Sequence, residues 1–313
     1  MPVSPRLLRR RLKSVTSTRK ITKAMELVAA AKMRRATTAT TSSRPYATAA
    51  WNLLLNLSSS SAPQSHPLLV VREVKRVLLI VITSHRGLAG GYNANIIRKV
   101  AEQLKNPERL VTPTGSPELR PIKKPAIDVV TIGRKGEAAV RRLGYNIIAS
   151  FPIASDIPGP DDLRPLAALV INEYKKGTYD KVVVAYTDFV SVMLQRAKLR
   201  QLLPVSPIDL EKTIKDHVIA RNEMTKQSQE YLFEPSPSEI LDFMLPRLVE
   251  TQLYQSLLES TASEHSARMV AMQSATNAAG DMIDDLTFTM NQARQAGITR
   301  EISEIAAGKA SLE

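Results

Sequence analysis

Three glycines, Gly87, Gly90 and Gly91, lie in the segment TSHRGLAGGYN (83–93), between a predicted strand and a predicted helix. A loop in that position can bind phosphate through the backbone N–H groups that begin the helix. The spacing does not fit G-x-G-x-x-G, and the chain contains no G-x-x-x-x-G-K-[ST] motif. A tight structural or protein-contacting turn is therefore favoured over a phosphate site.

Residues that could hold a metal or act as a base are scattered. The chain has no cysteine, which excludes thiolate metal sites and thiol nucleophiles. The histidines are His66, His85, His217 and His265. They are far apart in the sequence, and His265 has an acidic neighbour, Glu264. Asp281, Asp284 and Asp285 share a helix surface, but nothing nearby would raise a carboxyl pKa, so we expect no catalytic, metal or cofactor site.

Charge is distributed unevenly along the 313 residues, a length typical of roughly two domains. The chain carries 43 Lys and Arg against 30 Asp and Glu, a net charge of +13. Residues 6–44 hold twelve basic residues and one acid, whereas residues 239–313 hold five basic residues and eleven acids. The two ends are complementary in charge, and we expect them to associate.

The N-terminal segment is predicted to be one long helix. Residues 6–44 contain no Pro or Gly and are rich in Ala, Leu, Met, Lys and Arg. Apolar or small residues recur in steps of three, four or seven from Leu8 to Met33. Pro45 is the first break signal, and the segment AWNLLLNL after it is compatible with an extension past a kink.

The C-terminal segment is predicted to be a second long helix. Ser236 is the expected N-cap, Pro237 the first helical residue and Glu239 the capping-box partner. Beyond Pro246, small and apolar residues follow in alternating steps of three and four, which predicts a left-handed coiled-coil seam. The seam residues are Met269, Met272, Thr276, Ala279, Ile283, Leu286, Met290, Ala293 and Gly297.

We expect these two helices to pair antiparallel and to project as a rod. Each is longer than the width of a compact chain of this size, about 50 Å. Small seam residues such as Thr276, Ala279 and Ala293 permit close approach, but they bury little apolar area at about 25 cal/mol per Å². Such a rod would be marginal alone, so we infer that something encloses it.

The middle of the chain is predicted to be a Rossmann-like α/β domain. Near-continuous Val and Ile runs alternate with helical patterns, which indicates a mostly parallel sheet covered on both faces. The expected strands are 75–84, 128–133, 146–151 and 179–189, with 190–194 as an added edge strand. The expected helices are 93–105, 134–144 and 161–177. The predicted fold class is thus α/β with a long antiparallel coiled coil.

The basic stretch 6–35 has other interpretations. A transit peptide shares its composition, but the helical periodicity continues without a cleavage-like break. A nucleic-acid arm would carry interleaved aromatic residues, and none precedes Tyr46. A membrane-surface helix would carry Trp or Phe anchors. A basic coiled-coil protein that binds nucleic acid, and an α/β enzyme with helical tails, stay open as alternatives.

Five segments match one protein family in order. They are ITKAMELVAAAKMRRA (21–36), SRPYA (43–47), ITSHRGLAGGYNANI (82–96), YLFEPSPSEIL (231–241) and residues 262–305, which include MNQARQAGITREISEI. Together they resemble the gamma subunit of the F-type rotary ATP synthase. The resemblance implies a central shaft inside a ring of three alpha and three beta subunits, with the α/β domain beside the epsilon subunit and the c-ring. Rotation of this shaft would couple proton flow to ATP synthesis or hydrolysis.

The resemblance also implies which residues contact partners. The matching residues are Lys23, Met25, Arg86, Arg294, Gln295 and Thr299. The first two correspond to shaft positions that face a beta-subunit loop, the third to a basic residue that meets a beta-subunit catch loop, and the last three to polar positions that contact the ring. His85 stands where the family usually has Asp. The family's gamma subunit binds no nucleotide, so we expect no cofactor and no catalysis by this chain alone.

These expectations divide the chain into four parts. They are an N-terminal shaft helix (1–60), an α/β foot domain (70–205), a loop or insertion (206–235) and a C-terminal shaft helix (236–313). No run of 18 apolar residues exists, so we expect no membrane span. The lack of a separable leader favours a bacterial source and a peripheral position on the cytoplasmic face of the plasma membrane.

Overall fold

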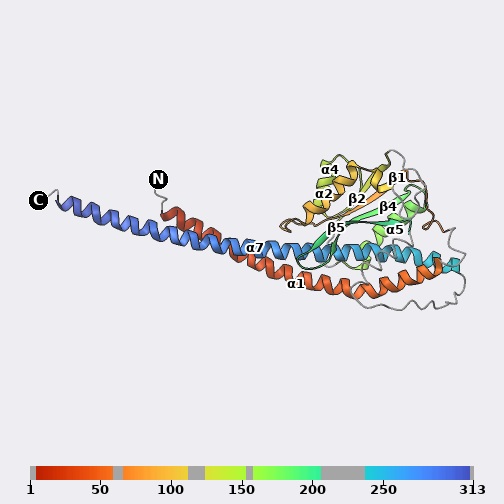
Figure 1. The fold of residues 1–313 in the computed structure, drawn as a ribbon, viewed down its shortest axis with the longest axis horizontal. Helices are drawn as coiled ribbons and strands as arrows, with labels where there is room; N and C mark the ends of the chain where they lie inside the picture. Colours follow the sequence, from red (N-terminus) through yellow and green to blue (C-terminus); the bar gives the residue numbers. More distant parts are fainter. Residues whose placement is uncertain (1–4, 59–65, 112–123, 153–157, 206–236, 311–313) are drawn as a thin grey trace. The chain divides into compact units, whose positions relative to one another are not determined.

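Two long helices and a five-stranded sheet make up the fold (Figure 1). The computed structural model describes residues 5–58, 66–111, 124–152, 158–205 and 237–310. The chain divides into two compact units. The first consists of residues 1–30 and 268–313 and includes the start of one long helix and the end of the other; the second consists of residues 31–267.

The long helices are α1 (Pro5–Ser58) and α7 (Pro237–Ala310). Pro237 is the first helical residue, as predicted, whereas its expected N-cap Ser236 lies outside the described residues. The helix α1 continues through Pro45, so the chain does not end its helix there. An interior proline costs about 3 kcal/mol, but the Leu- and Ala-rich segment that follows it favours helix strongly enough to continue.

Within the first unit, α1 and α7 pair antiparallel. The hydroxyls of Thr22 and Thr276 lie 2.8 Å apart across the pair. Of the predicted seam, three residues from Met272 to Ala279 are buried, and the later seam positions are half-buried as far as Ala293. The prediction is wrong at Gly297, which is exposed. Counted from the two threonines, the first residue of α1 comes opposite about residue 293, so no described part of α1 reaches Gly297.

The second unit contains a mostly parallel sheet, as predicted. Its strands are β1 (Arg76–Ile82), β2 (Ala126–Ile132), β3 (Ile147–Phe151), β4 (Lys181–Phe189) and β5 (Gln195–Leu203). Their order is β3-β2-β1-β4-β5, and only the β4–β5 pair is antiparallel. The central strands β1 and β4 are buried almost throughout, which explains their continuous Val and Ile runs.

The predicted edge strand at 190–194 is wrong. This segment is the turn between β4 and β5, closed by hydrogen bonds between the backbones of Ser191 and Leu194. The edge strand is instead β5, whose sequence QRAKLRQLL contains no Val or Ile. An edge strand with charged residues is partly exposed and so lacks the apolar signal of a central strand.

Helices cover both faces of the sheet. One face packs against α2 (Tyr92–Lys105) and α4 (Arg134–Arg142), in a cluster that includes Ile96, Val100 and Val140. The other face packs against α5 (Arg164–Lys175) and the first part of α7. Two short helices, α3 (Glu108–Val111) and a 3-10 helix (Pro160–Leu163), complete the described elements.

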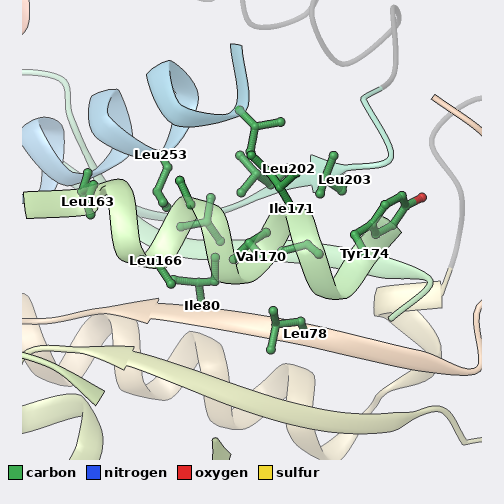
Figure 2. Close-up of a cluster of buried hydrophobic side chains, with 14 of the residues drawn as sticks. Leu78, Ile80, Leu163, Leu166, Val170, Ile171, Tyr174, Leu202, Leu203 and Leu253 are labelled. Carbon is green, nitrogen blue, oxygen red and sulfur yellow. The ribbon is translucent and has the colours of Figure 1, made fainter. Parts of the chain in front are cut away.

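The first part of α7 belongs to the core of the α/β domain. Figure 2 shows Leu253 of α7 in the same cluster as Leu166 and Val170 of α5 and Ile80 of β1. Six buried apolar residues of α7 lie in this cluster. They are Leu241, Leu245, Leu248, Val249, Leu253 and Leu257. The domain therefore depends on a helix that is far from the strands in sequence.

Replacing Leu253 with Ala tests this packing. Leu253 is fully buried, so the truncation leaves a cavity between α7 and the sheet. We expect the free energy of unfolding to fall by about 2–5 kcal/mol, measured by urea unfolding. The control is Phe243→Ala on the same helix, whose side chain is 71% exposed. That change should cost less than about 0.5 kcal/mol, and equal losses in the two variants would contradict the packing.

Candidate functional site

Two of the predicted contact residues lie on the half-buried and exposed sides of α1. The Lys23 side chain is 55% exposed, and its ammonium group lies 2.9 Å from a carboxylate oxygen of Glu26. Met25 is half-buried beside the seam. Apolar side chains of Ile21 and Leu27 are also more than half exposed on this helix. This part of α1 therefore presents a mixed cationic and apolar surface.

The other predicted shaft residues lie near the end of α7. Arg294, Gln295 and Thr299 are all exposed. The Thr299 hydroxyl donates to the Gln295 carbonyl within the helix. In the antiparallel register, Lys23 comes opposite about residue 275, so about 28 Å of helix axis separates it from Arg294. These two sets of residues do not form one site.

Arg86 belongs to the second unit, in the turn after β1. The Asn93 side chain at the start of α2 holds this turn, because its oxygen accepts from the Ser84 N–H at 3.1 Å and its nitrogen donates to the Ser84 hydroxyl at 2.7 Å. The Ser84 hydroxyl in turn donates to the Arg86 carbonyl at 2.6 Å. Leu88 has a φ of +61° and is 65% exposed. The turn thus presents an arginine and a leucine to solvent.

Thr83 joins this turn to α4. Its hydroxyl accepts a hydrogen bond from the Gly136 N–H at 2.8 Å, and the Lys135 N–H donates to the Ser84 carbonyl at 3.2 Å. Gly133 has a φ of +95°, and a Cβ there would overlap the Thr83 carbonyl oxygen. The close approach of these backbones accounts for Gly133 and Gly136, whereas Gly90 in the turn itself has a positive φ of +53°.

Among the described residues, no carboxyl group with a resolved pKa shift is suited to donating a proton. Every carboxyl group with a resolved pKa shift among them is held below its ordinary value. For Asp128, burial opposes ionisation, but hydrogen bonds from Asn146, Tyr179 and Arg76 outweigh it and lower the pKa. Such groups stay ionised and are not poised to donate protons. Across the described ranges, no cluster of three or more His, Cys, Asp or Glu side chains could hold a metal ion.

Exposed apolar side chains near the end of α7 escaped the sequence analysis. Phe288, Ile298, Ile302 and Ile305 are each at least half exposed. The spacing of the three isoleucines is helical, but they lie off the predicted seam, which was traced only along the face toward α1. An exposed apolar stretch of this kind is typical of a surface that another protein covers. In the part of the chain that the structure describes, no helix is both long and apolar enough to cross a membrane.

Comparison with known proteins identifies the family. A family model described as ATP synthase matches residues 4–312. An ATP synthase gamma chain from Pelotomaculum thermopropionicum is 42% identical over 310 residues, which cover 99% of both chains. The chain belongs to the ATP synthase gamma chain family. Other gamma chains of this family agree: that of Heliobacterium modesticaldum is 41% identical and that of Legionella pneumophila (strain Corby) 35% identical, each over 97% of this chain and 98% of its own.

Chains in solved structures of ATP synthases are similar in fold as well. A chain from the central stalk and c-ring of Tetrahymena thermophila mitochondrial ATP synthase is 24% identical, with a TM-score of 0.57 over 82% of this chain and 99% of that chain. A chain of Euglena gracilis mitochondrial ATP synthase in rotational state 3 is 17% identical, with a TM-score of 0.65 over 98% of this chain and 94% of that chain. These similarities support the fold, and the nucleic-acid-binding alternative finds no support in the comparisons.

Replacing Gly133 with Ala tests the backbone contact that holds the turn of this gamma-family chain. The new Cβ meets the Thr83 carbonyl and the positive φ is strained, so we expect a loss of about 2 kcal/mol or more in the free energy of unfolding. Gly159→Ala is the control, because its φ is −85° and its nearest new neighbour lies at 3.9 Å. If urea unfolding shows the two variants to be equally stable, the backbones of Gly133 and Thr83 do not lie as close as the structure places them.

Proposed function

We propose that this chain is the central rotor shaft of an F-type ATP synthase and couples transmembrane proton flow to ATP synthesis or hydrolysis. The observation that carries this proposal is the 42% identity with an ATP synthase gamma chain along 99% of both chains. A match over the whole length includes the long helices as well as the α/β domain. The shaft role is thus supported by the parts of the chain that a rotor would use.

The exposed surface of the helix pair supports enclosure by a ring of other subunits. In the buried seam, the side chains of Thr22, Thr276 and Ala279 are small and contribute little burial energy. Meanwhile Leu27 and Phe288, each at least 60% exposed, leave apolar area in water. A surrounding ring of three alpha and three beta subunits would cover this area without requiring a tight, immobile interface.

The six predicted contact residues suit weak contacts that break and re-form as the shaft turns. Lys23 and Arg294 are exposed cations, and an exposed ion pair contributes only about 0.2–1 kcal/mol. We propose that Lys23 and Met25 face a beta-subunit loop, that Arg86 meets a second beta-subunit loop, and that the residues near Arg294 touch the ring. Contacts of this strength can break and re-form in each rotary state.

The remaining assignments follow from the same proposal. The chain is a non-catalytic subunit without a cofactor, and nucleotide chemistry takes place on the beta subunits. The α/β domain lies beside the epsilon subunit and the c-ring. The chain is peripheral to the membrane, on the cytoplasmic face of a bacterial plasma membrane. The four-part division of the chain stays a prediction, and its segment 206–235 lies outside the described residues.

Native mass spectrometry of the tagged chain, isolated from its own membranes, tests the assembly. We expect one copy of the chain with three alpha and three beta subunits, and ATPase activity in the same fraction. Isolation of the chain bound to nucleic acid, or of a complex with several copies of it per ring, would refute the shaft proposal.

Replacing Met25 with Lys tests the proposed beta-subunit contact. Met25 is half-buried two residues from Lys23, so the variant adds a cation where contacts must break and re-form. An added ion pair of up to about 1 kcal/mol should lower the protons pumped per ATP hydrolysed about two- to fivefold in membrane vesicles, with assembly retained. Met25→Leu keeps the size and adds no charge, and should pump normally. Normal pumping by both variants would argue against a contact at this position.

A further inference from the structure

The strand order of the sheet reverses between β1 and β4. From β1 the chain passes through α2 to β2 on one face, whereas α5 leads into β4 on the opposite face. In open α/β sheets of this kind, ligands bind in the crevice outside the carboxyl ends of the two strands where the order reverses. Here part of the chain itself, the middle of α7, contacts the carboxyl end of β4, one of these two strands.

The contact centres on Thr187 near the carboxyl end of β4. The parallel ladder of β1 and β4 ends at Val81 and Ala185. In a β-strand, the backbone N–H and C=O groups of every second residue face the same neighbouring strand. Those of Thr187, two residues beyond Ala185, therefore face the side of β4 on which β1 has ended. The Ser260 hydroxyl accepts from the Thr187 N–H at 3.0 Å, and the Ser263 hydroxyl donates to the Thr187 carbonyl at 3.2 Å. Two serines of α7 thus bond to the backbone groups that a longer β1 would otherwise pair with.

A third serine holds the turn that follows β4. The Ser266 hydroxyl donates to the Val192 carbonyl at 2.6 Å, and the Gln195 side chain donates to the same carbonyl at 2.7 Å. Ser260, Ser263 and Ser266 are spaced by three residues and are each at most 1% exposed. They lie on one side of α7 and contact one continuous stretch of the β4–β5 hairpin.

The buried face of α7 changes chemistry where these contacts begin. Up to Leu257 it carries apolar residues that pack on the sheet, with Gln252, Gln255 and Ser256 buried among them. From Ser260 to Ser266 the hydroxyls of three buried serines bond to the β4–β5 hairpin. Leucine at these positions would leave the buried N–H and carbonyl of Thr187 without partners, which is unfavourable. Serine is small enough for the helix to approach the strand and still satisfies both groups. The pattern S-x-x-S-x-x-S therefore serves a contact and is not merely a polar helix face.

We propose that Ser260, Ser263 and Ser266 are positioning residues that lock α7 against rotation relative to the β4–β5 hairpin, so that torque passes between α7 and the α/β domain. Packing between leucines resists separation of the helix from the sheet, but it is not directional. Hydrogen bonds to fixed backbone atoms are directional and hold the helix at one rotational position about its axis. This inference deepens the proposed rotor function and rests on it.

The test compares hydrogen exchange with coupling in the assembled complex. In Ser260→Ala/Ser263→Ala, exchange of the Thr187 amide should accelerate by about five- to a hundredfold, because its buried N–H loses its partner. The protons pumped per ATP hydrolysed should fall at least about twofold, with the subunit stoichiometry unchanged.

Two variants serve as controls. Ser256→Ala removes a buried hydroxyl that donates to the Gln252 carbonyl within its own helix. Thr187→Val keeps the backbone groups that the serines bind. Both should match the wild type in Thr187 exchange and in coupling.

The outcomes separate the two proposals. Unchanged Thr187 exchange in the double variant overturns the serine contact, and lost protection with normal coupling overturns its role in torque. Equal loss of coupling in Ser256→Ala also overturns that role, because it shows a general effect of altering the helix. A wild-type chain that assembles with no ring overturns the rotor function, and the torque role with it. Exchange of the Thr187 amide in the double variant still decides whether the serine contact exists.

Discussion

The continuity of α7 is the constraint on which the rest of the structure depends. It is one helix from Pro237 to Ala310, yet its buried face meets three different environments in turn. Leucines up to Leu257 pack on the sheet, hydroxyls around Ser263 bond to a strand, and residues around Thr276 pair with α1. Each environment determines which side chains the helix can carry, because a helix presents the same face only every three or four residues.

The strength of these contacts differs in a way that suits a rotor. The leucine section is buried like any domain core and resists disruption by several kcal/mol per side chain. The buried seam with α1 consists mostly of small side chains around a threonine pair, with Leu8 and Met272 also buried, and the surface of the pair leaves apolar residues such as Leu27 and Phe288 exposed. A shaft must be firmly attached at one end and only weakly held by what surrounds the other, because strong contacts would stop rotation.

Much of this fold could be predicted from the sequence, because periodicity reports burial directly. The buried seam from Met272 to Ala279 and the Val-rich central strands follow from spacing and composition alone. The edge strand β5 could not be found this way, since a half-exposed strand needs no apolar run. The contacts of Ser260 and Ser263 were also hidden, because their partner is backbone 73 residues or more away. The proposed contact residues came from resemblance, since exposed side chains leave no burial pattern.

The most direct test of the rotor claim is to watch the chain turn. A bead attached to the α/β domain, with the ring of partner subunits fixed to a surface, should rotate in one direction when ATP is added, and stop when ATP is removed. Rotation would show that α7 transmits torque as one piece. ATP hydrolysis by the same fixed complex without any rotation of the bead would contradict the account.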